Sequence, residues 1–169
     1  MSEILSPATR AAAICTAAAR VAAGTLWLHE GMVKYQSRFG AADIALVINS
    51  ATSNSRVPRY FKWLASDVMR PLTGFFGCAT PLLETLLGAL LVLGVLPRWA
   101  SAASIAALML YWSADQLITQ YPVMAALSAI VLLPAAPASP WGALARVRRL
   151  FDRRSSCPTT SSTREGDPL

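Results

Sequence analysis

Five ionisable side chains lie in stretches of sequence that are otherwise apolar: Arg20, His29, Glu30, Glu84 and Asp115. A charge in an apolar interior is costly, so residues of this kind usually mark proton relays, ligand sites or buried ion pairs. A pocket with an acid, a histidine and aromatic rings suits a quinone head group. The quinone carbonyl oxygens accept hydrogen bonds, and its reduction consumes protons.

The depth of these residues can be estimated from their distance to cations expected at the membrane boundary. Arg20 lies 14 residues from Lys34, and Glu84 lies 14 residues from Arg70. At 1.5 Å per residue, both are about 21 Å from the same boundary. The spacing therefore predicts a buried ion pair between Arg20 and Glu84, and we favour a structural role for it.

The other charges are predicted to form a cluster nearer the outer surface. Asp115 follows Arg98 by 17 residues, or about 25 Å, which places it level with Glu30 and Lys34. Glu30 precedes Lys34 by four residues, the favourable helical spacing for an ion pair. The candidate catalytic residues are Glu30, Asp115 and His29, and the candidate quinone-binding residues are Lys34, Tyr111 and Trp112. A purely structural role for this cluster is an equal alternative.

Metal and dithiol chemistry find little support in the sequence. His29 is the one histidine, and no cysteine stands near it at ligand spacing, so no metal site is predicted. Three cysteines, an odd number without a C-x-x-C motif, argue against a dithiol catalyst acting alone.

The elements that must position these residues are four apolar runs, at about 11–33, 71–96, 99–119 and 122–144. A membrane-spanning helix needs about 20 apolar residues. Hydrophobic residues make up 54% of the chain and charged residues only 14%, against about 25% charged in a typical globular protein. We predict an all-α membrane protein, a four-transmembrane-helix bundle over residues 1–144.

The first two runs are joined by a long segment that is too polar to cross a membrane. It is patterned for two short helices at about 41–51 and 58–69, the second lying in the membrane interface. Its predicted apolar side carries Tyr60, Phe61, Leu64 and Val68, and its polar side carries Arg59, Lys62 and Ser66.

Residues 145–169 are predicted to form a basic, disordered cytoplasmic tail. Four spans then put both termini inside and the long loop outside a bacterial-type cytoplasmic membrane. Eight basic residues on the inner side against six in the loop favour this orientation. The net charge of +6 is assigned to contact with membrane lipids, because no nucleic-acid-binding motif accompanies it.

Two segments carry a resemblance to a known family. Residues 20–34 read RVAAGTLWLHEGMVK and residues 84–98 read ETLLGALLVLGVLPR. They resemble the first and second spans of the DoxX and DoxD membrane proteins, with Arg20, Lys34, Glu84 and Arg98 at motif positions. That family includes the small membrane subunit of thiosulfate:quinone oxidoreductase and membrane partners of thiol or superoxide-detoxifying enzymes.

The resemblance implies two functions of different classes. The first is a membrane subunit of a quinone-linked oxidoreductase that acts on thiosulfate or another sulfur compound, with quinone as a non-covalent cofactor and a partner redox subunit. The alternative is a non-catalytic scaffold that anchors a soluble redox or detoxifying enzyme through the arginine-rich tail. Either could form an oligomer.

Overall fold

The computed structural model describes residues 7–116 and 118–133. Within these residues the chain is helical and contains no β-strand, so the predicted all-α fold is confirmed. The elements are α1 (Pro7–Gln36), α2 (Ala41–Ser53), α3 (Arg59–Trp63), the π-helical turn η1 (Leu64–Met69), the 3-10 turn η2 (Arg70–Leu72), α4 (Thr73–Leu93), α5 (Pro97–Ser113) and α6 (Gln120–Leu132). The predicted tail at 145–169 lies outside the described residues.

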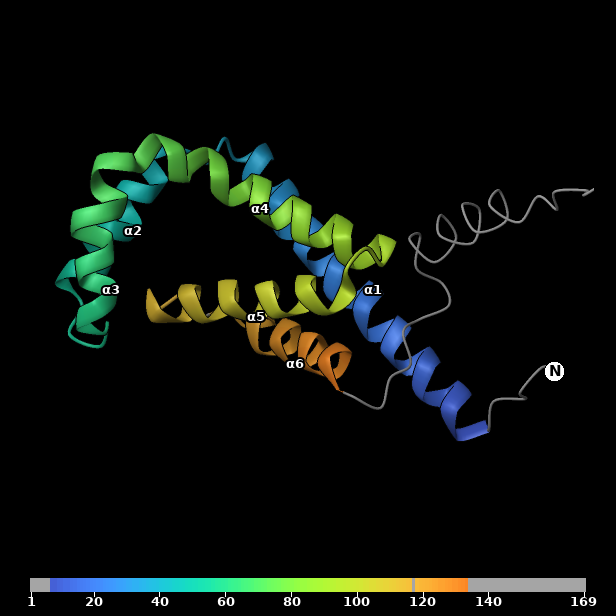
Figure 1. Cartoon of the computed structure of the whole chain (residues 1–169). Coiled ribbons are helices and arrows are strands. Elements are labelled where there is room, and N and C mark those ends of the chain that lie inside the picture. The colour runs from blue at the N-terminus through green and yellow to red at the C-terminus, as the bar shows by residue number, and fades with distance from the viewer. Residues whose placement is uncertain (1–6, 117, 134–169) are drawn as a thin grey trace, which may run out of the picture.

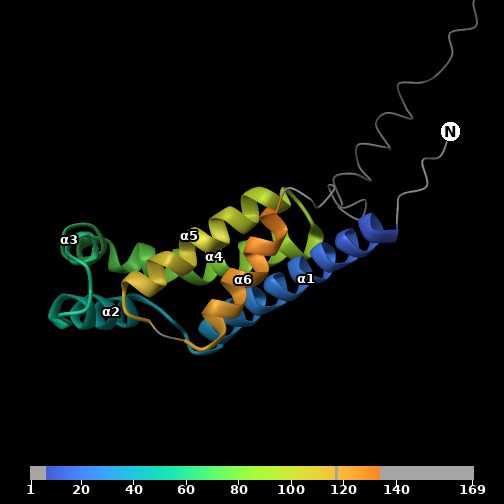
Figure 2. The same ribbon diagram turned by 90° about the horizontal axis from the view of Figure 1, so that it is seen from below.

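Helices α1, α4, α5 and α6 form a bundle, and α2 and α3 lie at one end of it. Figures 1 and 2 both show α2 and α3 beside the end of the bundle opposite the α4–α5 turn. We call residues 41–72 the cap. α2 matches the first predicted loop helix, whereas the second continues through η1 and η2 directly into α4.

The bundle packs most closely between α1 and α4. A Cβ atom on Gly24 would lie 2.9 Å from the carbonyl oxygen of Gly88, and one on Gly88 would lie 2.8 Å from that of Gly24. The hydrogen side chain is therefore required at both positions. Small residues that let two backbones approach are typical of helix pairs in membranes.

A chain of hydrogen-bonded polar side chains crosses the otherwise apolar core between α1, α5 and α6. Trp27 is fully buried, and its Nε1 donates a hydrogen bond to Ser104 Oγ at 2.7 Å. Ser104 in turn shares a hydrogen bond of 2.9 Å with Ser128. These bonds fix the α5–α6 hairpin against α1 without leaving the indole N–H unpaired.

Two helical stretches, Arg10–Gln36 and Arg59–Leu93, are long and apolar enough to cross a membrane. Only 28% and 33% of the residues in their most apolar windows are buried within the protein, whereas the core helix of a soluble protein is mostly buried. α5 has 17 residues and α6 has 13, or about 25 and 20 Å. α5 is shorter than the predicted third span, and the part of the predicted fourth span at 134–144 lies outside the described residues.

The cap turns away from α4 at a bend in the continuous helical run (Figure 1). The bend coincides with the π-helical turn and with Pro71, which lacks a backbone N–H and clashes with the preceding turn. The buried stripe of this run is Phe61, Ala65 and Met69. Tyr60, predicted on the apolar side with Phe61, is 61% exposed and does not belong to this buried stripe.

Candidate functional site

Four helices meet at the ammonium group of Lys34, in the last turn of α1. Its Nζ lies 2.8 Å from Glu84 Oε1 on α4 and 3.2 Å from Glu30 Oε2 on α1. The hydroxyl of Tyr111 on α5 donates to Glu84 Oε1 at 2.8 Å. The amide of Gln120 on α6 donates to the other oxygen of Glu30. We call these five residues the Lys34 cluster.

The cluster is buried although it is charged. Glu84 has no exposed surface, and the side chains of Glu30 and Lys34 are 11% and 16% exposed. Two carboxylates surround one ammonium, and Glu84 Oε2 is buried without a hydrogen-bond partner. An arrangement of this kind is costly unless it is paired and hydrogen-bonded, which makes it a candidate for function.

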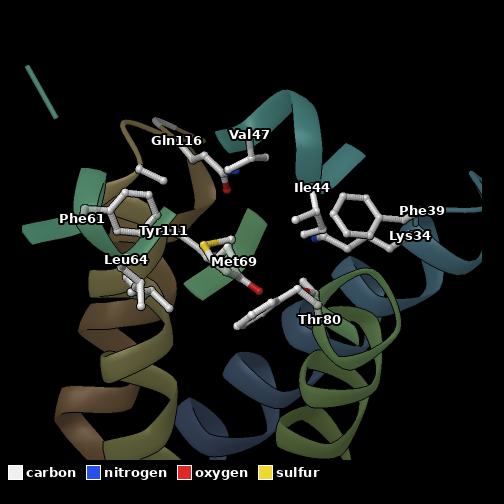
Figure 3. Close-up of a pocket in the computed structure, with 13 residues that line it drawn as sticks. Lys34, Phe39, Ile44, Val47, Phe61, Leu64, Met69, Thr80, Tyr111 and Gln116 are labelled. Atoms are coloured by element: carbon white, nitrogen blue, oxygen red, sulfur yellow. The ribbon is translucent and has the colours of Figure 1, made fainter. Parts of the chain in front are cut away.

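A cavity of about 100 Å³ lies between the cap, α4 and α5, against the Lys34 cluster. Figure 3 shows its lining residues. Its walls are Lys34, Phe39, Ile44, Val47, Phe61, Leu64, Met69, Phe76, Thr80, Leu110, Tyr111, Ala114 and Gln116. The lining is mainly apolar, with an ammonium, a phenol, a hydroxyl and an amide among the aromatic and aliphatic side chains. Small-molecule sites in proteins typically have such a lining, apolar and aromatic with a few polar groups.

Lys34 connects the charged cluster to the cavity. Its Nζ lies 5.9 Å from the ring centre of Phe39 and 6.0 Å from that of Tyr111, within reach of a cation–π interaction. Both rings line the cavity. A ligand in the cavity therefore meets a cation and a phenol that also belong to the buried network.

The sequence-based candidates are brought together only in part. The ion pair predicted between Glu30 and Lys34 is present, and Lys34 and Tyr111 line the cavity. Trp112 is 55% exposed and does not line it, and His29 is exposed on the outer face of α1. The reason is angular: Trp112 follows Tyr111 by one residue, and His29 precedes Glu30 by one, so each points about 100° away from its neighbour.

The predicted place of Asp115 in the Lys34 cluster was wrong. Asp115 lies two residues beyond Ser113, the last residue of α5, and has a left-handed backbone at φ 58°. Its carboxylate accepts hydrogen bonds of 2.6 Å from both Asn54 Nδ2 and Arg56 Nη2 of the cap. The hydrogen bond from Arg56, and to a smaller extent the one from Asn54, holds the pKa of Asp115 below its usual range. The physical reason is that α5 ends before the depth estimate assumed, and the cap supplies nearer donors.

The predicted ion pair of Arg20 with Glu84 was also wrong. Arg20 Nη1 donates to the backbone carbonyl of Leu91 at 2.7 Å and of Val92 at 3.3 Å. These carbonyls end α4, where the helix dipole favours a cation. The depth estimate failed because it placed Lys34 at the membrane boundary. The ammonium of Lys34 instead pairs with two buried carboxylates and lies level with Glu84.

Sequence reasoning missed most of the cavity wall, including Phe39, Phe61 and Thr80. It also missed Gln120 of the Lys34 cluster. The period of four between Phe61, Ala65 and Met69 could have shown which face of the cap is buried. No local signal identifies Gln120 or Thr80, because both depend on how helices distant in sequence pack. Among the described residues, no three His, Cys, Asp or Glu side chains lie together as metal ligands.

Comparisons of the chain with protein-family models, with curated proteins and with solved structures found no match.

Proposed function

We propose that the protein is the membrane subunit of a quinone-linked oxidoreductase of the DoxX and DoxD type, and that the cavity beneath the cap binds the quinone ring. One observation carries this proposal. Lys34 and Tyr111 line an apolar, aromatic cavity and at the same time bond to buried carboxylates. A quinone needs donors at its oxygens and a source of protons, and this wall offers both.

The electron donor in this proposal is a reduced sulfur compound such as thiosulfate, as the family resemblance implies. Two thiosulfate ions lose one electron each and join as tetrathionate. The quinone takes up these two electrons with two protons and becomes the quinol. Thiosulfate oxidation itself is assigned to a partner redox subunit, and the protein described here supplies the quinone site.

The proposed setting is a four-span bundle in a bacterial-type cytoplasmic membrane, with the cap on the outer side and both termini in the cytoplasm. Exposed aromatic side chains at both ends support a membrane setting. Tyr60 and Trp63 lie in the cap and Trp112 at the end of α5, whereas Trp99 lies beside the α4–α5 turn, and all four are more than half exposed. Tyrosine and tryptophan are enriched where a bundle crosses the two membrane surfaces.

The test is direct binding of a short-chain benzoquinone to the detergent-purified protein, followed by the ultraviolet difference spectrum before and after reductant. Tyr111→Phe removes a hydroxyl whose one proton turns from Glu84 Oε1 to the quinone oxygen when quinone binds. A net hydrogen bond of about 0.5–1.5 kcal/mol corresponds to a loss of affinity of about 2- to 12-fold. Tyr121→Phe is the matched control, because Tyr121 packs against Tyr111 with ring centres 5.6 Å apart but does not line the cavity.

A second variant pair tests the cavity itself. Ala114→Leu adds bulk to the cavity wall and should abolish binding, whereas Ala103→Leu, on the exposed side of α5, should leave it unchanged. Equal affinity in both variants would overturn the quinone site. The scaffold hypothesis would then take its place; the arginine-rich tail on which it depends lies outside the described residues.

A further inference from the structure

We propose that the pair of buried carboxylates, Glu30 and Glu84, binds one exchangeable proton at neutral pH, in addition to the protons of the Lys34 ammonium. The Lys34 cluster is then a proton-binding site in its own right. This inference concerns the unliganded protein and goes beyond quinone binding.

The argument begins with the charge of the cluster. Glu30 and Glu84 carry two negative charges when both are ionised, and Lys34 supplies one positive charge. Among the residues that the structure describes, the other polar groups that face the carboxylates are Gln120, Tyr111 and Tyr121. An amide is neutral, and a phenol is neutral at pH 7. A fully ionised cluster would thus leave one uncompensated negative charge in the interior of the bundle, which binding of a proton removes.

A metal cation is a poorer way to remove that charge. The Lys34 ammonium already lies between the two carboxylates, 2.8 Å from one and 3.2 Å from the other. A further cation bridging the same oxygens would be repelled by the ammonium at short range. A proton adds no bulk and forms a covalent O–H bond on a single oxygen.

The hydrogen bonds indicate which oxygen carries the proton. Both oxygens of Glu30 accept hydrogen bonds, one from Lys34 and one from Gln120, and such bonds favour the ionised form. Glu84 Oε1 accepts from Lys34 and Tyr111, whereas Glu84 Oε2 is buried and has no partner. Glu84 Oε2 is therefore the position at which we place the proton.

Two sides of the cluster offer routes for exchange. On one side, Tyr111 joins Glu84 to the cavity beneath the cap. On the other, Lys34 lines a second cavity of about 270 Å³, whose walls include the exposed residues Tyr35, Arg38 and Gly74. A proton can thus pass between the surface and the cluster. Its delivery to a bound quinone rests on the proposed function; its presence does not.

The experiment is infrared spectroscopy of the purified, quinone-free protein at neutral pH. A protonated carboxylic acid has a carbonyl stretching band distinct from that of a carboxylate, and this band shifts in D₂O when the proton exchanges. We expect about one such group per chain. Asp67→Asn removes an exposed carboxylate of the cap and is the control that should leave the band unchanged.

Variants of the cluster separate this proposal from simple burial of one acid. Glu84→Gln and Glu30→Gln each leave one carboxylate facing one ammonium, so each should remove the band. Lys34→Gln leaves two carboxylates without a cation and should increase the band about twofold. Glu30→Gln keeps the size and hydrogen-bonding shape of the side chain, so it serves even if Lys34→Gln fails to fold.

Two results would overturn the proposal: no carboxylic acid band in the native protein, or a band of full strength in Glu30→Gln. The second result would mean that Glu84 is protonated by burial alone, whatever the charge beside it. Because the spectra are recorded without quinone, failure of the quinone-binding test leaves this outcome unaffected, and the two proposals fail separately.

Discussion

Arg20 shows how a single buried side chain can differ in role from the one its type predicts. Its guanidinium does not neutralise an acid; it bonds to two carbonyls at the end of α4 and so joins α1 to the last turn of α4. Arg20 is 4% exposed and its Nε is buried without a partner. The side chain is thus held by backbone geometry and not by an opposite charge.

We expect Arg20→Leu to destabilise the protein by about 1.5–3 kcal/mol, the usual loss for a hydrogen bond made by a charged group. Because Arg20 and Glu84 share no partner, the effects of Arg20→Leu and Glu84→Gln should add within about 0.5 kcal/mol. Unfolding of the single and double variants in detergent measures this. Strong coupling between the two changes would restore the ion pair that the sequence suggested.

At the scale of the element, the contact between α1 and α4 depends on glycine. Gly24→Ala places a Cβ 2.9 Å from the backbone nitrogen of Val92 and from the carbonyl oxygen of Gly88. The helices must separate, and we expect a loss of about 1–3 kcal/mol in the free energy of unfolding.

Gly74→Ala is the matched control for that change, because Gly74 is also helical but its Cβ would meet no atom within 4 Å. Alanine is the better helix former by about 1 kcal/mol, so this variant should be neutral or stabilising. Thermal unfolding of the two variants compares them. A similar loss in both would show that the close approach of α1 and α4 is unimportant.

The cap is joined to α5 by a charged contact that depends on pH. Asp115 accepts hydrogen bonds from Arg56 and Asn54, and these lower its pKa. A carboxyl whose pKa is lowered on folding stabilises the folded state above its unfolded pKa of about 3.9, and this contribution is lost as the pH falls through the folded value.

We therefore expect Asp115→Asn to lower the unfolding temperature at pH 7, and the difference from the native protein to shrink as the pH falls below about 4. Asparagine tolerates the left-handed backbone found at this position, so the variant tests the charge and not the turn. Unfolding followed by circular dichroism from pH 7 to pH 3 gives both curves. A difference that is constant with pH would exclude the ionised contact.

At the scale of the whole molecule, the proposed orientation places the cap and the α4–α5 turn on opposite sides of the membrane. Cysteine labelling tests this in a variant whose three native cysteines are replaced by serine. Ser55→Cys lies in the exposed α2–α3 loop, and Arg98→Cys lies at the exposed start of α5. A membrane-impermeant thiol reagent should label position 55 in intact cells and position 98 only after permeabilisation. Labelling of both in intact cells would contradict a spanning bundle.

The sequence by itself determined the features that depend on local geometry. Apolar composition and run length predicted helices long enough to span a membrane, and residues 7–116 and 118–133 are helical without a strand. α2 lies where its pattern predicts. The pair of Glu30 with Lys34 follows from a spacing of four on one helix, since residues one turn apart are neighbours on any α-helix.

Only the tertiary structure decided which distant residues meet. The depth estimate assumed straight helices that start at cations on the membrane boundary. Lys34 instead bonds to buried Glu84, and α4 follows a bend at residues 64–72. As a result, Glu84 bonds to Lys34 and Tyr111, and Arg20 bonds to carbonyls at the end of α4. Asp115, which lies beyond the end of α5, bonds to the cap. The physical reason is that partner choice among buried charges depends on shifts of a few ångströms between helices, which composition and periodicity do not specify.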